Sequence, residues 1–98
     1  IEFLEQKYPS RIYLQEMADR ACMSRRHFHR IFRNATGESP IDYLIQIRLQ
    51  KARELLRTTG LSVADVAYKV GFADVNHFIK KFRHHLQVTP HKYRINFD

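Results

Sequence analysis

The sequence predicts an all-α fold of seven helices, in which a long linker helix joins two helix-turn-helix subdomains of the tandem, homeodomain-like kind. Three observations predict it. Apolar residues recur at helical spacing almost throughout, the few glycines and prolines fall at the ends of helical stretches, and part of the chain repeats itself. We expect the first subdomain at residues 1–39, the linker helix at 40–59 and the second subdomain at 60–98, together forming one domain.

Most of the expected helices have a recognisable start or end in the sequence. Ser24 and Ser62 are natural N-caps, because a serine hydroxyl accepts a hydrogen bond from a free backbone N–H of the first turn. The step into Pro9 disfavours helix, and Gly37 and Gly60 are typical of helix ends. The expected helices cover roughly 1–8, 13–21, 25–35, 40–58, 63–70 and 75–86, and a short seventh helix begins at Thr89-Pro90.

The linker helix has the clearest start signal. Ser39 is suited to cap it, Pro40 suits the first helical position, and Asp42 complements the positive end of the helix dipole. At about 1.5 Å per residue the helix spans about 25 Å, which is long enough to separate two lobes. Its apolar stripe consists of Ile41, Leu44, Ile45, Leu49, Ala52, Leu55 and Leu56.

The internal repeat predicts the same local structure twice. Each copy is a short helix, a tight turn and a second helix, followed by a capped helix, which is the helix-turn-helix plan. At an offset of 49 residues, Leu14, Ala18, Ala21 and Met23 match Val63, Ala67, Val70 and Phe72. At an offset of 50 residues, His27, Phe28, Phe32, Arg33, Ser39-Pro40 and Tyr43 match His77, Phe78, Phe82, Arg83, Thr89-Pro90 and Tyr93.

The second helix of each copy is apolar on one face and basic or polar on the other. Arginine and asparagine suit guanine and adenine edges, and lysine and arginine suit phosphates. The expected core faces are Phe28, Ile31, Phe32 and Ala35, and then Phe78, Phe82 and Leu86. The expected outward faces are Arg25, Arg26, His29, Arg30 and Arg33, and then Asn76, His77, Lys80, Lys81, Arg83 and His84.

The charge distribution indicates an anionic partner, nucleic acid before a membrane surface. The net charge is +7, and no acidic residue occurs in 20–37 or 75–97. Each stretch holds five of the seventeen Lys and Arg, and together they hold all six His. No apolar run is long enough to cross a membrane, and no catalytic set, phosphate-binding glycine loop or metal-ligand spacing indicates an enzyme or a cofactor. The single cysteine, Cys22, is expected to be a small buried residue.

Several motifs resemble those of the AraC/XylS family of bacterial transcription regulators, over about residues 12–94. The second copy carries the three more specific ones, and the linker helix adds a fourth. They are Val66-Ala67-Tyr68-Lys69-Val70-Gly71-Phe72, then Phe78 and Phe82-Arg83, then Thr89-Pro90-His91-Lys92-Tyr93-Arg94, and on the linker helix Arg48, Ala52 and Leu55-Leu56.

The resemblance implies a cytoplasmic, sequence-specific binder of double-stranded DNA that activates transcription. Its two recognition helices are expected to enter successive major grooves about 34 Å apart. RNA polymerase is a further candidate partner, and an effector ligand and dimerisation are assigned to a region absent from this chain. The alternative is a protein-interaction module that contacts RNA polymerase and binds DNA only weakly and without specificity. The expected DNA-binding residues are Arg25, Arg26, His29, Arg30, Arg33, Val75, Asn76, His77, Lys80 and Lys81.

Some positions depart from the family pattern or stay ambiguous. Cys22 and Gln87 stand where the family usually has glycine, which questions the backbone geometry at both turns. The arginines of the linker helix, Arg48, Arg53 and Arg57, are compatible with a solvated face, a phosphate contact or an internal role. We expect the first subdomain, with more arginines on its outward face, to supply more of the base discrimination.

Overall fold

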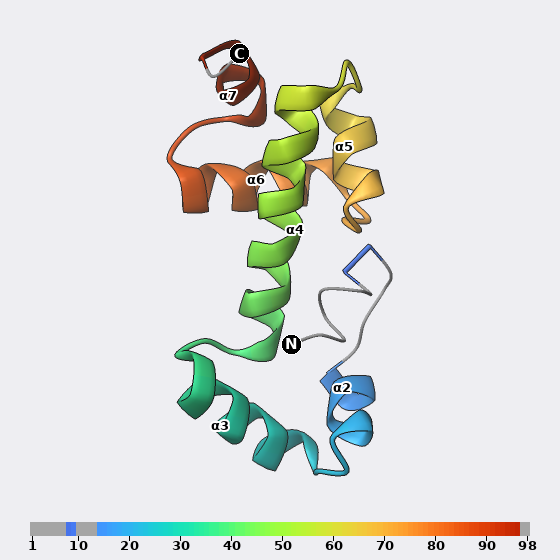
Figure 1. Ribbon diagram of the computed structural model, residues 1–98, viewed down its shortest axis with the longest axis vertical. Helices are drawn as coiled ribbons and strands as arrows, with labels where there is room; N and C mark the ends of the chain where they lie inside the picture. The colour runs from blue at the N-terminus through green and yellow to red at the C-terminus, as the bar shows by residue number, and fades with distance from the viewer. Residues whose placement is uncertain (1–7, 10–13, 97–98) are drawn as a thin grey trace.

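The computed structural model describes residues 8–9 and 14–96, and that part of the chain contains six helices (Figure 1). The expected helix over 1–8 lies outside the described residues except for its last position, so six helices are seen where seven were expected. The other six expected helices are confirmed within one residue at each predicted boundary. They are α2 (Leu14–Arg20), α3 (Arg25–Thr36), α4 (Pro40–Thr58), α5 (Val63–Lys69), α6 (Val75–Leu86) and α7 (Pro90–Asn96).

The predicted serine caps are all present. The hydroxyls of Ser24, Ser39 and Ser62 each accept a hydrogen bond from a backbone N–H three residues further on, at 3.0–3.2 Å. Each such cap contributes about 1 kcal/mol. At the end of α3, Gly37 adopts the left-handed conformation with φ 82°, as its glycine predicts. The C-cap of α4 is Thr59, one residue before the glycine that was expected to end this helix.

The helices form two lobes along α4, and the molecule measures 43 × 22 × 21 Å. Figure 1 shows α2 and α3 at one end of α4 and α5, α6 and α7 around its other end. A small buried cluster of Met17, Phe32 and Leu44 closes the first lobe. A larger cluster, to which Ile45, Leu49, Ala52 and Leu56 contribute, closes the second. Thus α4 supplies core residues to both lobes and connects them.

The second lobe is built around a chain of aromatic rings. Phe78 packs against Phe72 and Phe82 with ring centres 5.3 and 5.6 Å apart, and Phe82 packs against Tyr93 at 5.7 Å. All four side chains are buried, and tilted or edge-on pairs of this kind contribute about 0.5–1.5 kcal/mol each beyond the burial of area. The core role expected for Phe78 and Phe82 is therefore confirmed.

Four residues expected in the core or on an apolar stripe are exposed. Ile31 is 42% exposed and Ile41 40%, and Ala35 and Cys22 are exposed as well. The repeat offers a reason for Ile31 and Ala35, because their counterparts on α6 are Lys81 and His85, which line a cleft toward the first lobe. Helical periodicity alone therefore overestimated the burial of this face of α3. Cys22 lies at the tip of the α2–α3 turn, with φ 57°.

Candidate nucleic-acid interface

The exposed face of α3 carries the arginines that the sequence singles out. Arg25, Arg26, Arg30 and Arg33 are exposed, and His29 is half-buried. Two of these arginines stand in the first turn of α3, which holds no acidic residue. Positive charge at this end opposes the helix dipole, at a cost of about 0.3–1 kcal/mol each. These arginines are therefore not explained by helix stability, and an anionic partner would offset their cost.

A side-chain hydrogen bond holds the most central of these arginines. Nη2 of Arg30 donates to Nδ1 of His27 at 3.1 Å, across one turn of α3. Only an unprotonated Nδ1 can accept this bond, so the contact belongs to the neutral form of His27. Restricting Arg30 in this way lowers the conformational entropy that a bidentate contact with a base would otherwise cost.

The exposed face of α6 forms an open groove. Asn76, Lys80, Arg83 and His84 line it together with Ile79 and Gln87. The sequence placed Arg83 and His84 on the outward face, but they were not among the expected DNA-binding residues. Their side chains nevertheless lie along the same groove as Asn76 and Lys80.

The other expected residues of α6 are placed differently from one another. Val75 is half-buried and packs against the core of the second lobe, so its side chain is largely used inside the protein. His77 is exposed, and its ring meets Phe72 edge-on with ring centres 5.5 Å apart. Lys81 is half-buried and lines the cleft between the lobes. The groove of α6 therefore contains only two of the five residues expected on this helix.

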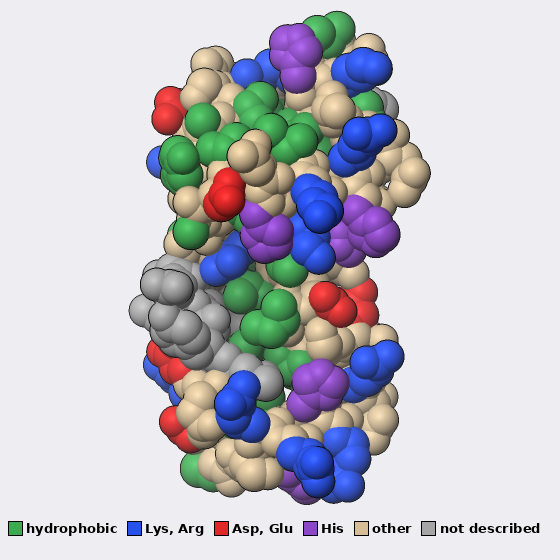
Figure 2. All heavy atoms as spheres, turned by 180° about the vertical axis from the view of Figure 1, so that it is seen from behind, with side chains coloured by type: hydrophobic (Ala, Val, Ile, Leu, Met, Phe, Trp, Pro, Cys, Tyr) green, Lys and Arg blue, Asp and Glu red, His purple; other side chains and the backbone are tan. Residues whose placement is uncertain are grey.

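Helices α3 and α6 lie one in each lobe and run in the same general direction across the molecule (Figure 1). Seen from behind, Lys, Arg and His side chains follow one edge of the surface through both lobes (Figure 2). The lobes share α4, so the separation of these basic surfaces is set by a single rigid helix. This arrangement presents two positively charged helices along one elongated body.

The arginines of α4 differ in their surroundings. Nε of Arg48 donates to the carbonyl oxygen of Tyr8 at 2.8 Å, and its guanidinium lies 5.8 Å from the centre of the Phe72 ring. Burial lowers the pKa of Arg48 from its ordinary value. Nε of Arg53 donates to the hydroxyl of Tyr93 at 3.4 Å, although the Arg53 side chain is exposed. Arg48 therefore has an internal role and Arg53 contacts α7 from the surface, whereas Arg57 is exposed, as a solvated face predicts.

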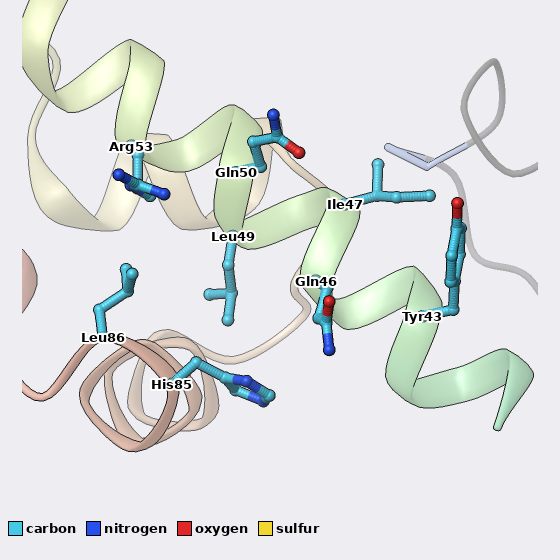
Figure 3. Close-up of a pocket in the computed structure, with 8 residues that line it drawn as sticks. All are labelled: Tyr43, Gln46, Ile47, Leu49, Gln50, Arg53, His85 and Leu86. Atoms are coloured by element: carbon cyan, nitrogen blue, oxygen red, sulfur yellow. The ribbon is translucent and has the colours of Figure 1, made fainter. Parts of the chain in front are cut away.

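A second hollow lies where α6 crosses α4. Figure 3 shows Tyr43, Gln46, Ile47, Leu49, Gln50 and Arg53 reaching it from α4, and His85 and Leu86 from α6. None of the expected DNA-binding residues lines it. Within the described residues, no three His, Cys, Asp or Glu side chains are placed to share a metal ion. The part of the chain with described structure also holds no helix long and apolar enough to span a membrane.

This geometry defines a tandem helix-turn-helix domain: in each lobe a short helix and a tight turn precede an exposed basic helix. The profile of a family described as "Helix-turn-helix domain" matches residues 17–96. The chain belongs to the AraC/XylS family of helix-turn-helix transcription regulators. Its Gly71-Phe72 step, buried phenylalanines and Tyr93-Arg94 pair stand at the positions where the family motifs were identified in the sequence.

Known relatives support the assignment. The HTH-type transcriptional activator RhaS of Escherichia coli (strain K12 / DH10B) is 38% identical over 98 residues, which is all of this chain and 35% of RhaS. The DNA-binding domain of AdpA, solved with a target DNA, is 34% identical with a TM-score of 0.94, covering 98% of this chain and 86% of that one. The C-terminal domain of the response regulator yesN from Fusobacterium nucleatum is 36% identical with a TM-score of 0.90, covering 95% and 91%.

The chain spans about a third of the length of the curated relatives that it matches. These relatives are named as transcription regulators, not as enzymes. The shared part is the helix-turn-helix DNA-binding domain of the AraC type.

Proposed function

We propose that this chain binds double-stranded DNA at specific sequences, with α3 and α6 in successive major grooves, and that it activates bacterial transcription in the cytoplasm. The observation that carries the proposal is the mounting of one exposed basic helix in each lobe on the shared helix α4. A body 43 Å long is long enough to reach two grooves about 34 Å apart on one face of DNA. The activating role rests on the similarity to RhaS. A contact with RNA polymerase stays a prediction.

The two helices are assigned unequal parts. On α3, Arg26, His29 and Arg30 are proposed to read bases, and Arg25 and Arg33 to contact phosphates. On α6, Asn76 and Lys80 lie in an open groove, whereas the packing of Val75 leaves it little more than a methyl contact. Base discrimination is therefore expected to be stronger in the half-site bound by α3. The proposed phosphate contacts and base contacts together are Arg25, Arg26, His29, Arg30, Arg33, Val75, Asn76, His77, Lys80 and Lys81.

Selection of bound duplexes from a random pool tests the proposal. The expected result is a bipartite motif whose halves lie about one helical turn, roughly 10 base pairs, apart. An R26A/R30A variant is expected to lose one half of the motif, and an N76A/K80A variant the other. A single short box would contradict reading by both helices, and no enrichment at all would contradict sequence-specific binding.

A further inference from the structure

An open cleft of about 250 Å³ separates the two lobes near the C-terminal ends of α3 and α6. Arg33, Glu38 and Asp42 line it from the first lobe and the start of α4, and Lys81, His84 and His85 line it from α6. A water molecule occupies about 30 Å³ of the liquid, so the cleft has room for a phosphodiester group with its nearest waters. It is a charged site that no base-reading role uses.

The cleft opens beside the proposed reading surfaces. His84 lines both the cleft and the groove that contains Asn76 and Lys80. Arg33 lies on the exposed face of α3 and also lines the cleft. When two helices occupy successive major grooves, the sugar-phosphate backbone between those grooves passes the middle of the protein.

The permanent charges of the cleft cancel. Arg33 and Lys81 bring two positive charges, and Glu38 and Asp42 bring two negative ones. The Glu38 carboxylate accepts a hydrogen bond from Nε2 of Gln46, which restrains its position in the cleft. Figure 2 shows acidic side chains at the waist, with basic and histidine side chains in the lobes on either side. A cleft without net charge has no electrostatic preference for phosphate.

The protonation state of the two histidines determines the net charge of the cleft. His84 and His85 lie in contact, with ring centres 5.2 Å apart, and histidine is the side chain that changes charge between about pH 5 and pH 8. The charged groups around them are Arg33, Glu38 and Asp42 across the cleft and Lys81 on α6. Arg53 and Tyr43 line the hollow on the side of His85 that faces α4. With neutral imidazoles the cleft is balanced, and each added proton makes it positive.

We propose that this cleft between the lobes contacts the DNA backbone between the two major grooves, and that protonation of His84 and His85 strengthens the contact. The inference rests on the proposed function, because it needs DNA to be held by both α3 and α6. The carboxylates of Glu38 and Asp42 keep the contact weak while the histidines are neutral. DNA affinity therefore rises as the pH falls toward about 6.

The test measures fluorescence anisotropy of a labelled duplex carrying the selected site, at about pH 6 and about pH 8, over a range of salt. The affinity of the wild type is expected to be higher at the lower pH, and its salt dependence steeper by about one unit in the log–log slope. An H84Q/H85Q variant is expected to lose most of this difference. H91Q, which changes an exposed histidine on α7 outside the cleft, is the matched control and keeps it.

The histidines on α3 and on the exposed face of α6, His27, His29 and His77, are present in all three proteins, so the readout is the difference between the variants. An E38Q/D42N variant adds a second arm: it is expected to bind at about pH 8 with the steeper salt slope that the wild type shows at about pH 6. Circular dichroism melting at both pH values checks that each variant is folded.

The two proposals fail in different ways. If H84Q/H85Q and the wild type show the same pH dependence while both bind DNA, the cleft does not contact the backbone as proposed. If the wild type prefers no duplex over another, sequence-specific binding is contradicted instead. Non-specific binding also uses phosphates, so a random duplex still tests the cleft in that case.

Discussion

A Cβ atom on Gly71 would lie 2.8 Å from Nε of Arg48 and 2.6 Å from the carbonyl oxygen of Tyr8, to which that Nε donates. The space taken by the hydrogen bond is therefore the space that a side chain at residue 71 would need. Arg48 then covers the ring of Phe72, the next residue of the same turn. The arginine of the linker helix and the Gly-Phe step of the second lobe, two separate motifs in the sequence, are one contact in the structure.

Replacing this glycine is expected to be strongly destabilising. The G71A variant would place a side chain at φ 109° and against a backbone carbonyl, so we expect a loss of about 2 kcal/mol or more in the free energy of unfolding. Urea denaturation measures it. G60A is the matched control, because nothing lies within 4 Å of a Cβ there, and it is expected to be close to neutral. Equal stability of the two variants would contradict the contact.

A second left-handed residue makes the opposite prediction. Gln87 ends α6 with φ 60° and ψ 24°, a conformation that glycine adopts without the Cβ penalty. Q87G is expected to raise the free energy of unfolding by about 0.5 kcal/mol, because the relief of strain exceeds the added entropy of the unfolded chain. Q87A removes the exposed hydrogen bond from Nε2 to the His84 carbonyl but keeps the strain, so it separates the two effects. A lower melting temperature for Q87G than for the wild type would refute the argument.

Arg94 fastens α7 to the end of the linker helix. Its Nε donates to the Leu56 carbonyl at 3.0 Å and its Nη2 to the Thr59 carbonyl at 3.4 Å, which satisfies acceptors that the helix end leaves free. We expect R94A to cost about 1–3 kcal/mol in the free energy of unfolding, since hydrogen bonds from charged donors are the stronger ones. R94K keeps the charge but cannot donate to both carbonyls from a planar guanidinium, so it is expected to recover only part of the loss. Thermal melts of the wild type and both variants measure the difference.

Arg30 tests base reading directly. We expect R30A to lower the affinity for the selected site by about 1–3 kcal/mol and to relax specificity at one base pair, as for an arginine on a guanine edge. H27A removes the acceptor that orients Arg30 and is expected to weaken the same position less. Competition binding against single-base variants of the site measures both. A uniform loss across all sequences would show a phosphate contact instead.

The sequence predicts the helices well because particular residue types satisfy the free backbone groups at helix ends. Ser39 and Pro40 mark the start of α4 with groups that fill unsatisfied backbone positions, and the structure begins the helix there. Burial is harder to predict, because the pattern on one helix does not show whether another lobe covers it. Ile31 has the spacing of a core residue, yet its side chain is 42% exposed.

In the candidate site, too, some features follow from helical periodicity and others depend on tertiary packing. Outward position on α3 was correctly predicted for Arg25, Arg26 and Arg30, since periodicity alone places them opposite the core. The edge-on contact of His77 with Phe72 and the second role of His84 as a wall of the cleft depend on packing between distant segments. Such contacts leave no signature in the spacing of residues along one helix.

The linker helix also sets the rotational phase of the two lobes. Each residue added to an α-helix turns the rest of the chain by about 100° and moves it by about 1.5 Å. One inserted residue in the middle of α4 would leave both cores intact in composition but swing α6 away from the side of the molecule that α3 occupies. Exposed positions of α4 such as Lys51 and Glu54 are free to change, whereas the number of residues between Ser39 and Thr59 is not. Evolution can therefore retune each reading helix separately, but a change in half-site spacing would require a different α4.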